Sequence, residues 1–190
     1  MKKGVMMIVI VGLGNPGKNY ETTIHNLGYL AIDHFANTYG LNFSKSKYLG
    51  RVAEGVIDGQ KIVLLKPETF MNLSGKSVEA CVNMLKLEPS QILVLVDDID
   101  LDFGALRVRA KGSAGTHNGL RDITQRIGQD FNRLRIGAGR PDGMDLASYV
   151  LGNMSKDRLQ ILSEVFEKTD RIIKYFVDNQ KVEGIDVNKI

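Results

Sequence analysis

The sequence predicts a single α/β domain over residues 1–190, in which a twisted mixed β-sheet carries helices on both faces as a three-layer α/β/α arrangement. Two wholly apolar runs, Met6 to Val11 and Ile92 to Val96, are typical of strands that helices bury on both faces. Between and after these runs, apolar residues recur at helical spacing. A chain of 190 residues can bury about 70% of its unfolded surface around one core, so we expect one domain.

The composition is that of an ordinary globular protein, with 43% apolar and 25% charged residues. No run approaches the ~20 apolar residues of a membrane span, so we expect no membrane association. Met1 to Lys3 and the following apolar run suggest a signal peptide, but Gly-Asn-Pro-Gly interrupts the run and no small-residue cleavage pattern follows. We therefore expect a cytoplasmic protein. The single cysteine, Cys81, excludes an internal disulfide and a cysteine-built metal site.

The first apolar run leads into a glycine-rich turn, and His25 and Asn26 follow near the start of a helical pattern. The glycines at 12, 14 and 17 permit a tight turn and a close approach of backbones. Functional residues in parallel sheets gather at the carboxyl ends of the strands. This stretch is therefore the first candidate for a functional site.

The same glycines also spell G-x-G-x-x-G, the dinucleotide-binding fingerprint. That motif needs its third glycine in a helix and an acidic residue about 20 positions on, at the end of the next strand. Here residues 16–19 continue as a turn, and Asp33 falls inside a helical pattern. A nucleotide-dependent oxidoreductase is thus a distant alternative, which would be removed if NAD gave no thermal stabilisation.

The remaining elements follow from periodicity and turn signals. Residues 22–39 form a helical stripe that Gly40 ends, and Asp58-Gly59 joins two strands, 49–57 and 61–65, as a hairpin that Pro67 closes. Further along we expect a helix at 75–86 with Cys81 in its core-facing stripe, a strand at 105–110 and a short helix at 120–127. A strand at 131–138 follows, with Arg133 and Arg135 on one face. The last predicted element is a long amphipathic helix at 155–177 whose apolar face includes Ile161.

The net charge is only +3, but the segment from Gly104 to Arg140 carries eight basic and two acidic residues. A local excess of this kind is typical of polyanion binding. The competing explanation is that these residues form ordinary solvated faces of strands and helices.

The three histidines are His25, His34 and His117. If His25 and His34 share one helix, nine residues at about 100° each set them on opposite faces, so they cannot form a metal pair. His25 lies near the glycine-rich turn, whereas His34 is better explained as a surface or packing residue. A catalytic histidine needs an orienting carboxylate, and either Asp97 or Asp98, which close a buried strand, can supply it.

The acidic cluster after this strand also allows a metal site. A calcium loop starting at Asp98 needs glycine at position 103 and glutamate at position 109, but the chain has Phe103 and Arg109 there. A magnesium site stays open as an alternative.

No nucleophilic side chain is evident, because the chain has no G-x-S-x-G motif and Cys81 belongs to a helix stripe. If His25 is a base, it activates water. Asn15, Asn72 and Asn118 each follow a predicted strand, and an amide side chain can hold a carbonyl or an amide. A role in turns is the competing explanation for each of them.

Taken together, the segments resemble bacterial-type peptidyl-tRNA hydrolase. Five blocks carry the resemblance in the family's order over nearly the whole chain: GLGNPGKNY (12–20) with HN at 25 and 26, KPETFMNLSG (66–75), DDIDL (97–101), GSAGTHNGL (112–120) and RLRIGAGRP (133–141). Thr116 departs from the pattern, since many relatives carry glycine there.

The resemblance implies cleavage of the ester that joins a peptide to the 3′ ribose of tRNA, which recycles tRNA from aborted translation. It implies that His25 takes a proton from water and that Asp97 keeps it basic and oriented. Asn15 would distinguish peptidyl-tRNA from aminoacyl-tRNA, and Asn72 would hold the water or the carbonyl. The residues that the resemblance implies to contact the end of the peptidyl-tRNA are Tyr20, Phe70, Asn72 and Asn118. From the charge distribution, we expect the basic segment, with Arg107, Arg109 and Arg135, to bind the acceptor-stem phosphates.

We therefore expect a monomeric hydrolase that needs no cofactor or metal and whose partner is the acceptor stem and 3′ end of peptidyl-tRNA. The main rival is an RNA-binding module on the same fold without hydrolysis, as in a plant splicing-factor relative. Intact His25, Asn72 and Asp97 argue against that rival.

Overall fold

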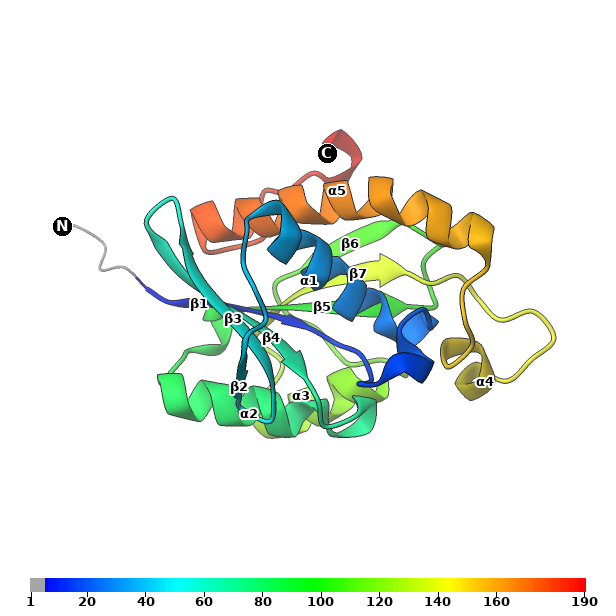
Figure 1. The fold of residues 1–190 in the computed structure, drawn as a ribbon, viewed down its shortest axis with the longest axis horizontal. Coiled ribbons are helices and arrows are strands. Elements are labelled where there is room, and N and C mark those ends of the chain that lie inside the picture. The colour runs from blue at the N-terminus through cyan, green and yellow to red at the C-terminus, as the bar shows by residue number, and fades with distance from the viewer. Residues whose placement is uncertain (1–5) are drawn as a thin grey trace.

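A seven-stranded mixed sheet lies between two layers of helices (Figure 1). The computed structural model describes residues 6–190, so Met1 to Lys3 of the signal-peptide argument lie outside the described residues. The strand order is β2-β3-β4-β1-β5-β7-β6, with the four central strands parallel and the others antiparallel to their neighbours. The strands are β1 (Ile8–Gly12), β2 (Lys45–Lys47), β3 (Gly50–Ile57), β4 (Gln60–Pro67), β5 (Ile92–Asp98), β6 (Leu106–Arg109) and β7 (Asn132–Gly137).

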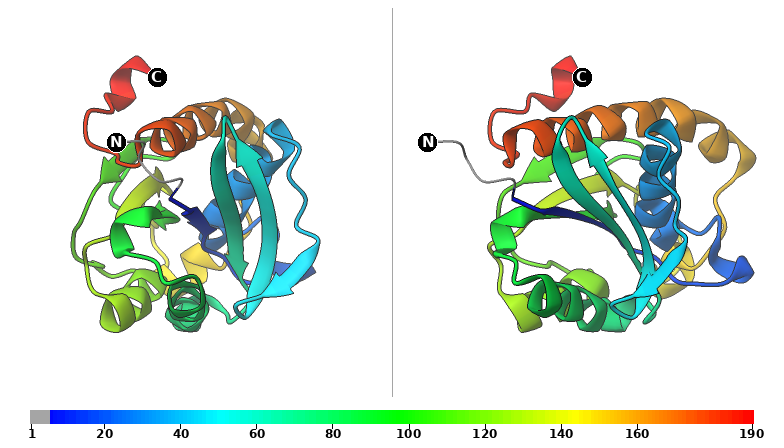
Figure 2. Two further views of the ribbon diagram at one scale, coloured as in Figure 1. Left: turned by 90° about the vertical axis from the view of Figure 1, so that its left-hand side faces the viewer. Right: turned by 60° about the vertical axis from the view of Figure 1, so that its left-hand side comes forward.

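The helices cover both faces of this twisted sheet (Figure 2). Helices α1 (Leu27–Thr38) and α5 (Lys156–Asn179) cover one face, and α2 (Ser74–Leu85) and α3 (Asn118–Ile127) cover the other. A short helix, α4 (Leu146–Val150), precedes α5. The predicted three-layer α/β/α domain is thus confirmed. No helix within residues 6–190 is long and apolar enough to cross a membrane.

The central strands are apolar throughout because each of their faces packs on a separate core. In β1, Ile8 and Ile10 face the α1–α5 side, whereas Val9 and Val11 face the α2–α3 side. All four are buried. Burying one such side chain stabilises the fold by about 1.5–3 kcal/mol, so the strand that leads into the glycine-rich turn is firmly anchored.

Several elements differ from the sequence-based predictions. Helix α1 begins at Leu27 rather than at residue 22, and a short 3₁₀ helix, Ile24–Asn26, precedes it. Strand β2 was not predicted because its Lys-Ser-Lys sequence is wholly exposed and carries no apolar alternation. In α5, Ile161 is 44% exposed, since Leu162, about 100° further round the helix, takes the core-facing position.

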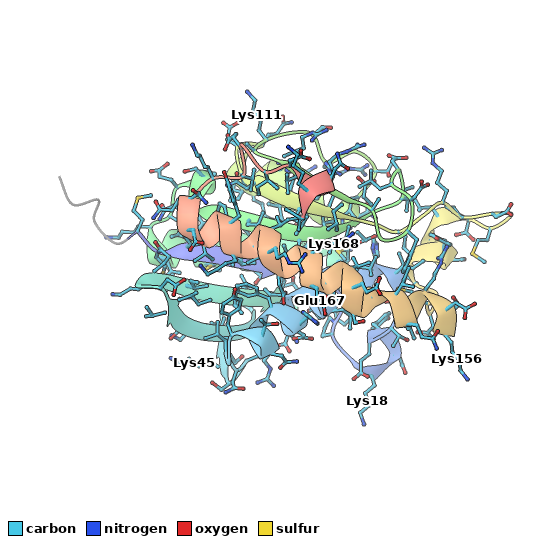
Figure 3. The ribbon with its side chains drawn as sticks, turned by 90° about the horizontal axis from the view of Figure 1, so that it is seen from above. Lys18, Lys45, Lys111, Lys156, Glu167 and Lys168 are labelled. Carbon is cyan, nitrogen blue, oxygen red and sulfur yellow. The ribbon has the colours of Figure 1, made fainter. Side chains whose placement is uncertain are left out.

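The outer face of α5 is polar, and Glu167 and Lys168 lie on it in Figure 3. Beneath it, the Nδ1 atom of His34 lies 2.9 Å from Oδ2 of Asp170. Because His25 precedes α1, the two histidines do not share one helix. His34 instead packs in the α1–α5 interface, as a packing residue should.

Candidate active site

Three parallel strands, β1, β4 and β5, end at one cleft of about 640 Å³. The carboxyl ends of parallel strands are where α/β proteins bind their ligands. The cleft is lined by every residue predicted to take part in the chemistry and by most of those predicted to contact the substrate: Asn15, His25, Asn72 and Asp97, with Tyr20, Phe70, Asn118 and Arg135.

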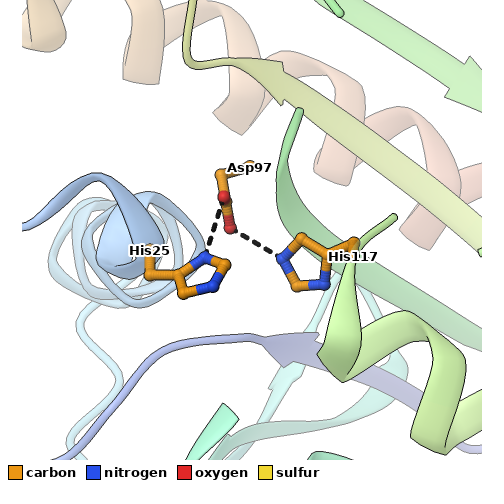
Figure 4. A group of neighbouring side chains, drawn as sticks. All are labelled: His25, Asp97 and His117. Carbon is orange, nitrogen blue, oxygen red and sulfur yellow. Dashed lines mark hydrogen bonds and ion pairs between the residues drawn. The ribbon is translucent and has the colours of Figure 1, made fainter. Parts of the chain in front are cut away.

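At the centre of the cleft a single carboxylate lies between two imidazoles (Figure 4). Nδ1 of His25 is 2.9 Å from Oδ2 of Asp97, and Nε2 of His117 is 2.9 Å from Oδ1. Asp97 is the buried end of β5, with 2% of its side chain exposed, whereas His25 is 12% exposed. Asp97, rather than Asp98, therefore faces the histidine.

The hydrogen bonds assign the protons of both rings. His117 caps the N-terminus of α3, where its Nδ1 accepts a hydrogen bond from the N–H of Leu120 at 3.2 Å. Its Nε2 therefore carries the proton that is donated to Asp97. His25 donates from Nδ1 to the other oxygen of Asp97, which leaves the lone pair on its Nε2. Within the part of the chain that the structure describes, no group bonds this Nε2, which is the arrangement of a general base.

The carboxylate and the His25 imidazole shift each other's pKa. Burial lowers the pKa of His25, but the charge of Asp97 and the hydrogen bond to it outweigh this, so the net pKa lies above the ordinary 6.5. Burial raises the pKa of Asp97, but His117 and His25 together hold it well below its usual range. Asp97 therefore stays ionised beside the His25 ring.

A glycine allows His25 to reach the strand ends. The first turn of α1 rests on the turn after β1, where the N–H of Tyr29 donates to the carbonyl of Leu13 at 3.0 Å. A Cβ atom on Gly28 would lie 2.6 Å from the N and O atoms of Leu13 and 2.4 Å from the carbonyl oxygen of Leu95. Only glycine permits this approach, which places the residues just before α1 over the end of β5.

The orientation of the Asn15 side chain is also determined. Its Oδ1 accepts a hydrogen bond from the backbone N–H of Met71 at 2.7 Å. The Nδ2 amide group therefore points the other way, and within residues 6–190 nothing bonds it. Asn15 thus presents two N–H donors to the cleft.

Two aromatic rings stand at the rim of the cleft. Tyr20 and Phe70 meet edge to face with their centroids 6.5 Å apart. Phe70 has φ 63° and ψ 159°, a backbone region that is essentially reserved for glycine, and 51% of it is exposed. Such strain at a cleft is typical of functional positions.

Arg133 does not take part in a polyanion surface, which corrects the interpretation of the basic segment. It is fully buried, and its guanidinium donates to the carbonyls of Gly112, Ser113 and Gln129. Sequence alternation put Arg133 on the same face as Arg135, and that is correct, but the loop after β6 covers it. Its role is to hold the loop that carries His117.

The three arginines that were predicted to contact the tRNA lie in a strip across β6 and β7. We call this strip the basic strip (Arg107, Arg109 and Arg135). Arg107 is opposite Arg135 in the strand register. Arg135 lines the cleft, whereas the exposed Arg107 and Arg109 lie outside it on the edge strand. The basic strip therefore runs from the cleft toward the edge of the sheet.

His25, Asp97 and His117 could also hold a metal ion, since one ligand atom from each lies within 4.8 Å of the others. The hydrogen bond from Leu120 argues against this use. A metal on Nε2 of His117 would require the proton on Nδ1, which would then face the N–H of Leu120. The donor set fits a hydrogen-bonded array better than a metal site.

Two contributors to the site were not predicted as such. His117 was noted only as one of three histidines, and Asn26 only as the neighbour of His25. The block GTHNG contains a helix-start pattern, but which ring nitrogen would reach a carboxylate 20 residues away depends on tertiary packing.

Comparison with known proteins identifies the family. A family model described as peptidyl-tRNA hydrolase matches residues 9–189. The peptidyl-tRNA hydrolase of Clostridium perfringens (strain SM101 / Type A) is 46% identical over 181 residues, which cover 95% of this chain and 96% of that protein. That of Alkaliphilus metalliredigens (strain QYMF) is 43% identical, again over 95% of this chain and 96% of the relative.

A solved structure agrees with the family model and with the relatives. The crystal structure of peptidyl-tRNA hydrolase from Acinetobacter baumannii superposes with a TM-score of 0.86 at 36% identity and covers 92% of this chain and 90% of its own. The residues matched by the family model include every segment that lines the cleft. The chain therefore belongs to the peptidyl-tRNA hydrolase family of carboxylic ester hydrolases.

Proposed function

We propose that the cleft hydrolyses the ester between a peptide and the 3′ ribose of tRNA by means of water that His25 activates, thereby recycling tRNA from aborted translation. The observation that carries this proposal is the pairing of His25 Nδ1 with Asp97 at 2.9 Å, which leaves Nε2 as a base toward the cleft. A tRNA substrate implies action in the cytoplasm, and a complete site within one chain needs no second copy, in keeping with a monomer.

The reaction balances with these groups alone. A water hydrogen-bonded to Nε2 of His25 attacks the ester carbonyl as its proton passes to the imidazole, and Asp97 stabilises the imidazolium. The tetrahedral intermediate then releases the 3′ oxygen of the ribose, which takes the proton back from His25. The products are tRNA with a free 3′ hydroxyl and a peptide carboxylic acid, which loses its proton to the solvent. General base catalysis of this kind contributes about 10²–10⁴-fold.

The asparagines of the cleft bind the polar groups of the substrate around the ester. The exposed Asn72, on the 3₁₀ helix Met71–Leu73, is suited to hold the water or the ester carbonyl, and Asn118 begins α3 on the other side of the cleft. Asn15 presents only N–H donors, so it binds a carbonyl of the peptide. The free ammonium of aminoacyl-tRNA offers only donors, so it meets Asn15 without a hydrogen bond. Asn15 thereby selects for an N-blocked substrate.

The basic strip binds the acceptor stem of the tRNA, and Tyr20 and Phe70 contact its 3′ end. Arg135 lies at the cleft, and Arg107 and Arg109 continue the strip outward from the ester. Contacts of this kind are with phosphates, so binding is strongly salt-dependent and largely indifferent to tRNA sequence.

The test is release of N-acetylamino acid from N-acetylaminoacyl-tRNA, with and without a chelator. His25→Ala should lower kcat by about 10²–10⁴-fold because the base is lost, while the Kd for tRNA stays nearly unchanged. The wild-type rate should be the same in the chelator.

His34→Ala is a matched control. His34 meets Asp170 with the same 2.9 Å distance that joins His25 to Asp97, but it lies between α1 and α5, away from the cleft. Its removal should leave kcat and KM unaltered. Retained turnover in His25→Ala, or equal losses in the two variants, would refute the assignment of the base, and tRNA binding without any wild-type turnover would favour an RNA-binding module.

A further inference from the structure

The residue next to the proposed base makes an unusual pair of contacts. Asn26 is buried, with 2% exposed, and both ends of its side-chain amide bond to the backbone of Asn15. Its Oδ1 accepts from the N–H of Asn15 at 2.8 Å, and its Nδ2 donates to the carbonyl of Asn15 at 3.0 Å. One side chain thus satisfies both backbone groups of a residue 11 positions earlier.

These contacts belong to a short chain of hydrogen bonds that joins three segments. Asn26 ends the 3₁₀ helix before α1, Asn15 lies in the turn after β1, and Met71 begins the 3₁₀ helix after β4. Asn26 holds the backbone of Asn15, and the N–H of Met71 holds its side-chain oxygen. The direction of the Asn15 N–H donors therefore depends on both neighbours.

We propose that Asn26 is a positioning residue that sets substrate selectivity by holding Asn15 so that its amide donors face the peptide carbonyl. The proposal rests on the function given above, in which Asn15 meets the substrate. Asn26 lies behind Asn15 and does not line the cleft, so it acts only through Asn15.

Only an amide side chain suits this position. The carboxylate of an aspartate has nearly the same shape but offers only acceptors, so one of its oxygens would face the carbonyl oxygen of Asn15. That repulsion displaces Asn15, and a displacement of about 1 Å near a reacting group can cost on the order of 10²-fold in rate. The substitution Asn26→Asp therefore tests orientation with almost no change in volume.

The experiment is a double-mutant cycle on kcat/KM for N-acetylaminoacyl-tRNA, with Asn26→Asp, Asn15→Ala and the combination. We expect Asn26→Asp to lower kcat/KM by about 10–100-fold and to reduce the preference for N-acetylaminoacyl-tRNA over aminoacyl-tRNA. In the Asn15→Ala background the same substitution should cost less than about 3-fold, because residues that act through one another are non-additive.

The proposal would be overturned if the effects of Asn26→Asp and Asn15→Ala on kcat/KM simply multiplied in the double variant. It would also be overturned if folded Asn26→Asp kept the wild-type preference for N-acetylaminoacyl-tRNA over aminoacyl-tRNA. If Asn26→Asp does not fold, the smaller and neutral Asn26→Ser goes through the same cycle with the same criteria. A wild-type protein that fails to hydrolyse N-acetylaminoacyl-tRNA would refute the proposed function itself, which distinguishes that outcome from failure of the role of Asn26.

Discussion

At the scale of single residues, the site depends on how the two oxygens of Asp97 are shared. One accepts from His25 and the other from His117, whose remaining nitrogen is occupied by the N–H of Leu120. Of these two rings, only that of His25 keeps a nitrogen without a hydrogen-bond partner within residues 6–190. Two imidazoles on one carboxylate thus have different roles, because their other hydrogen bonds differ.

Asp97→Asn should change both the height and the position of the pH profile. An amide N–H facing Nδ1 of His25 forces the proton onto Nε2, so kcat should fall by about 10²–10⁴-fold. The charge that raises the pKa of His25 is also lost while burial remains, so the acid limb of kcat/KM should move to lower pH. A limb that stays in place would contradict the assignment of His25 as the titrating base.

The same pair makes a pH-dependent contribution to stability. The raised pKa of His25 stabilises the fold fully below its unfolded pKa of about 6.5, and this is lost as pH rises through the folded value. The lowered pKa of Asp97 stabilises above its unfolded pKa of about 3.9, and this is lost on acidification. The difference in urea stability between the wild type and Asp97→Asn should therefore be largest between about pH 4 and 6.5.

At the scale of elements, the cleft is assembled from short segments at the strand ends. The turn after β1, the 3₁₀ helices before α1 and after β4, and the start of α3 each deliver one or two polar side chains. Gly28 lets one of these segments touch the backbone of another, and Arg133 holds the loop before α3. The strained Phe70 marks where β4 turns into its 3₁₀ helix.

Two substitutions of Phe70 separate the strain of its backbone from the contribution of its ring to substrate binding. Phe70→Gly removes the ring and the unfavourable φ, whereas Phe70→Ala removes the ring and keeps the φ. We expect the glycine variant to be more stable than the alanine variant by about 1 kcal/mol in urea unfolding, in spite of its more flexible unfolded chain. Both should raise KM for the tRNA substrate. Equal stabilities would show that the backbone at residue 70 is unstrained.

At the scale of the whole molecule, the parallel strands place the side chains of the candidate active site at one edge of the sheet. The antiparallel pair β6–β7 carries the basic strip beside this edge. The opposite helical layer carries mixed charge, with Glu167 and Lys168 adjacent on α5 (Figure 3). A net charge of +3 is therefore distributed unevenly, and the positive part lies near the cleft.

Replacing Arg107 and Arg109 together by glutamine should raise KM more than it lowers kcat. Each lost phosphate contact should flatten the plot of log Kd for tRNA against log salt by about 0.7–0.9. Lys168→Gln, which removes one charge from the exposed face of α5, is the control and should alter neither quantity. An unchanged salt slope in the arginine variant would place the tRNA footprint elsewhere.

Much of this organisation is local and was predictable from sequence. Residues 6–11 and 92–96 are apolar at every position, as is typical of strands buried on both faces, although the first strand begins only at Ile8. Pro67 and Asp58-Gly59 gave the ends of the hairpin correctly. Elements without a periodic signal, such as β2 and α4, could not be predicted because their residues are mostly exposed or too few to show a pattern.

The sequence by itself determined the layered α/β architecture and, through five short blocks, which residues gather at the strand ends. Only the tertiary structure decided that Asp97 rather than Asp98 faces His25, that His117 shares that carboxylate, that Asn26 braces Asn15, and that Arg133 is buried. The physical reason is that periodicity reports the face on which a residue lies, whereas the choice of hydrogen-bond partner depends on the approach of segments that are distant in the chain.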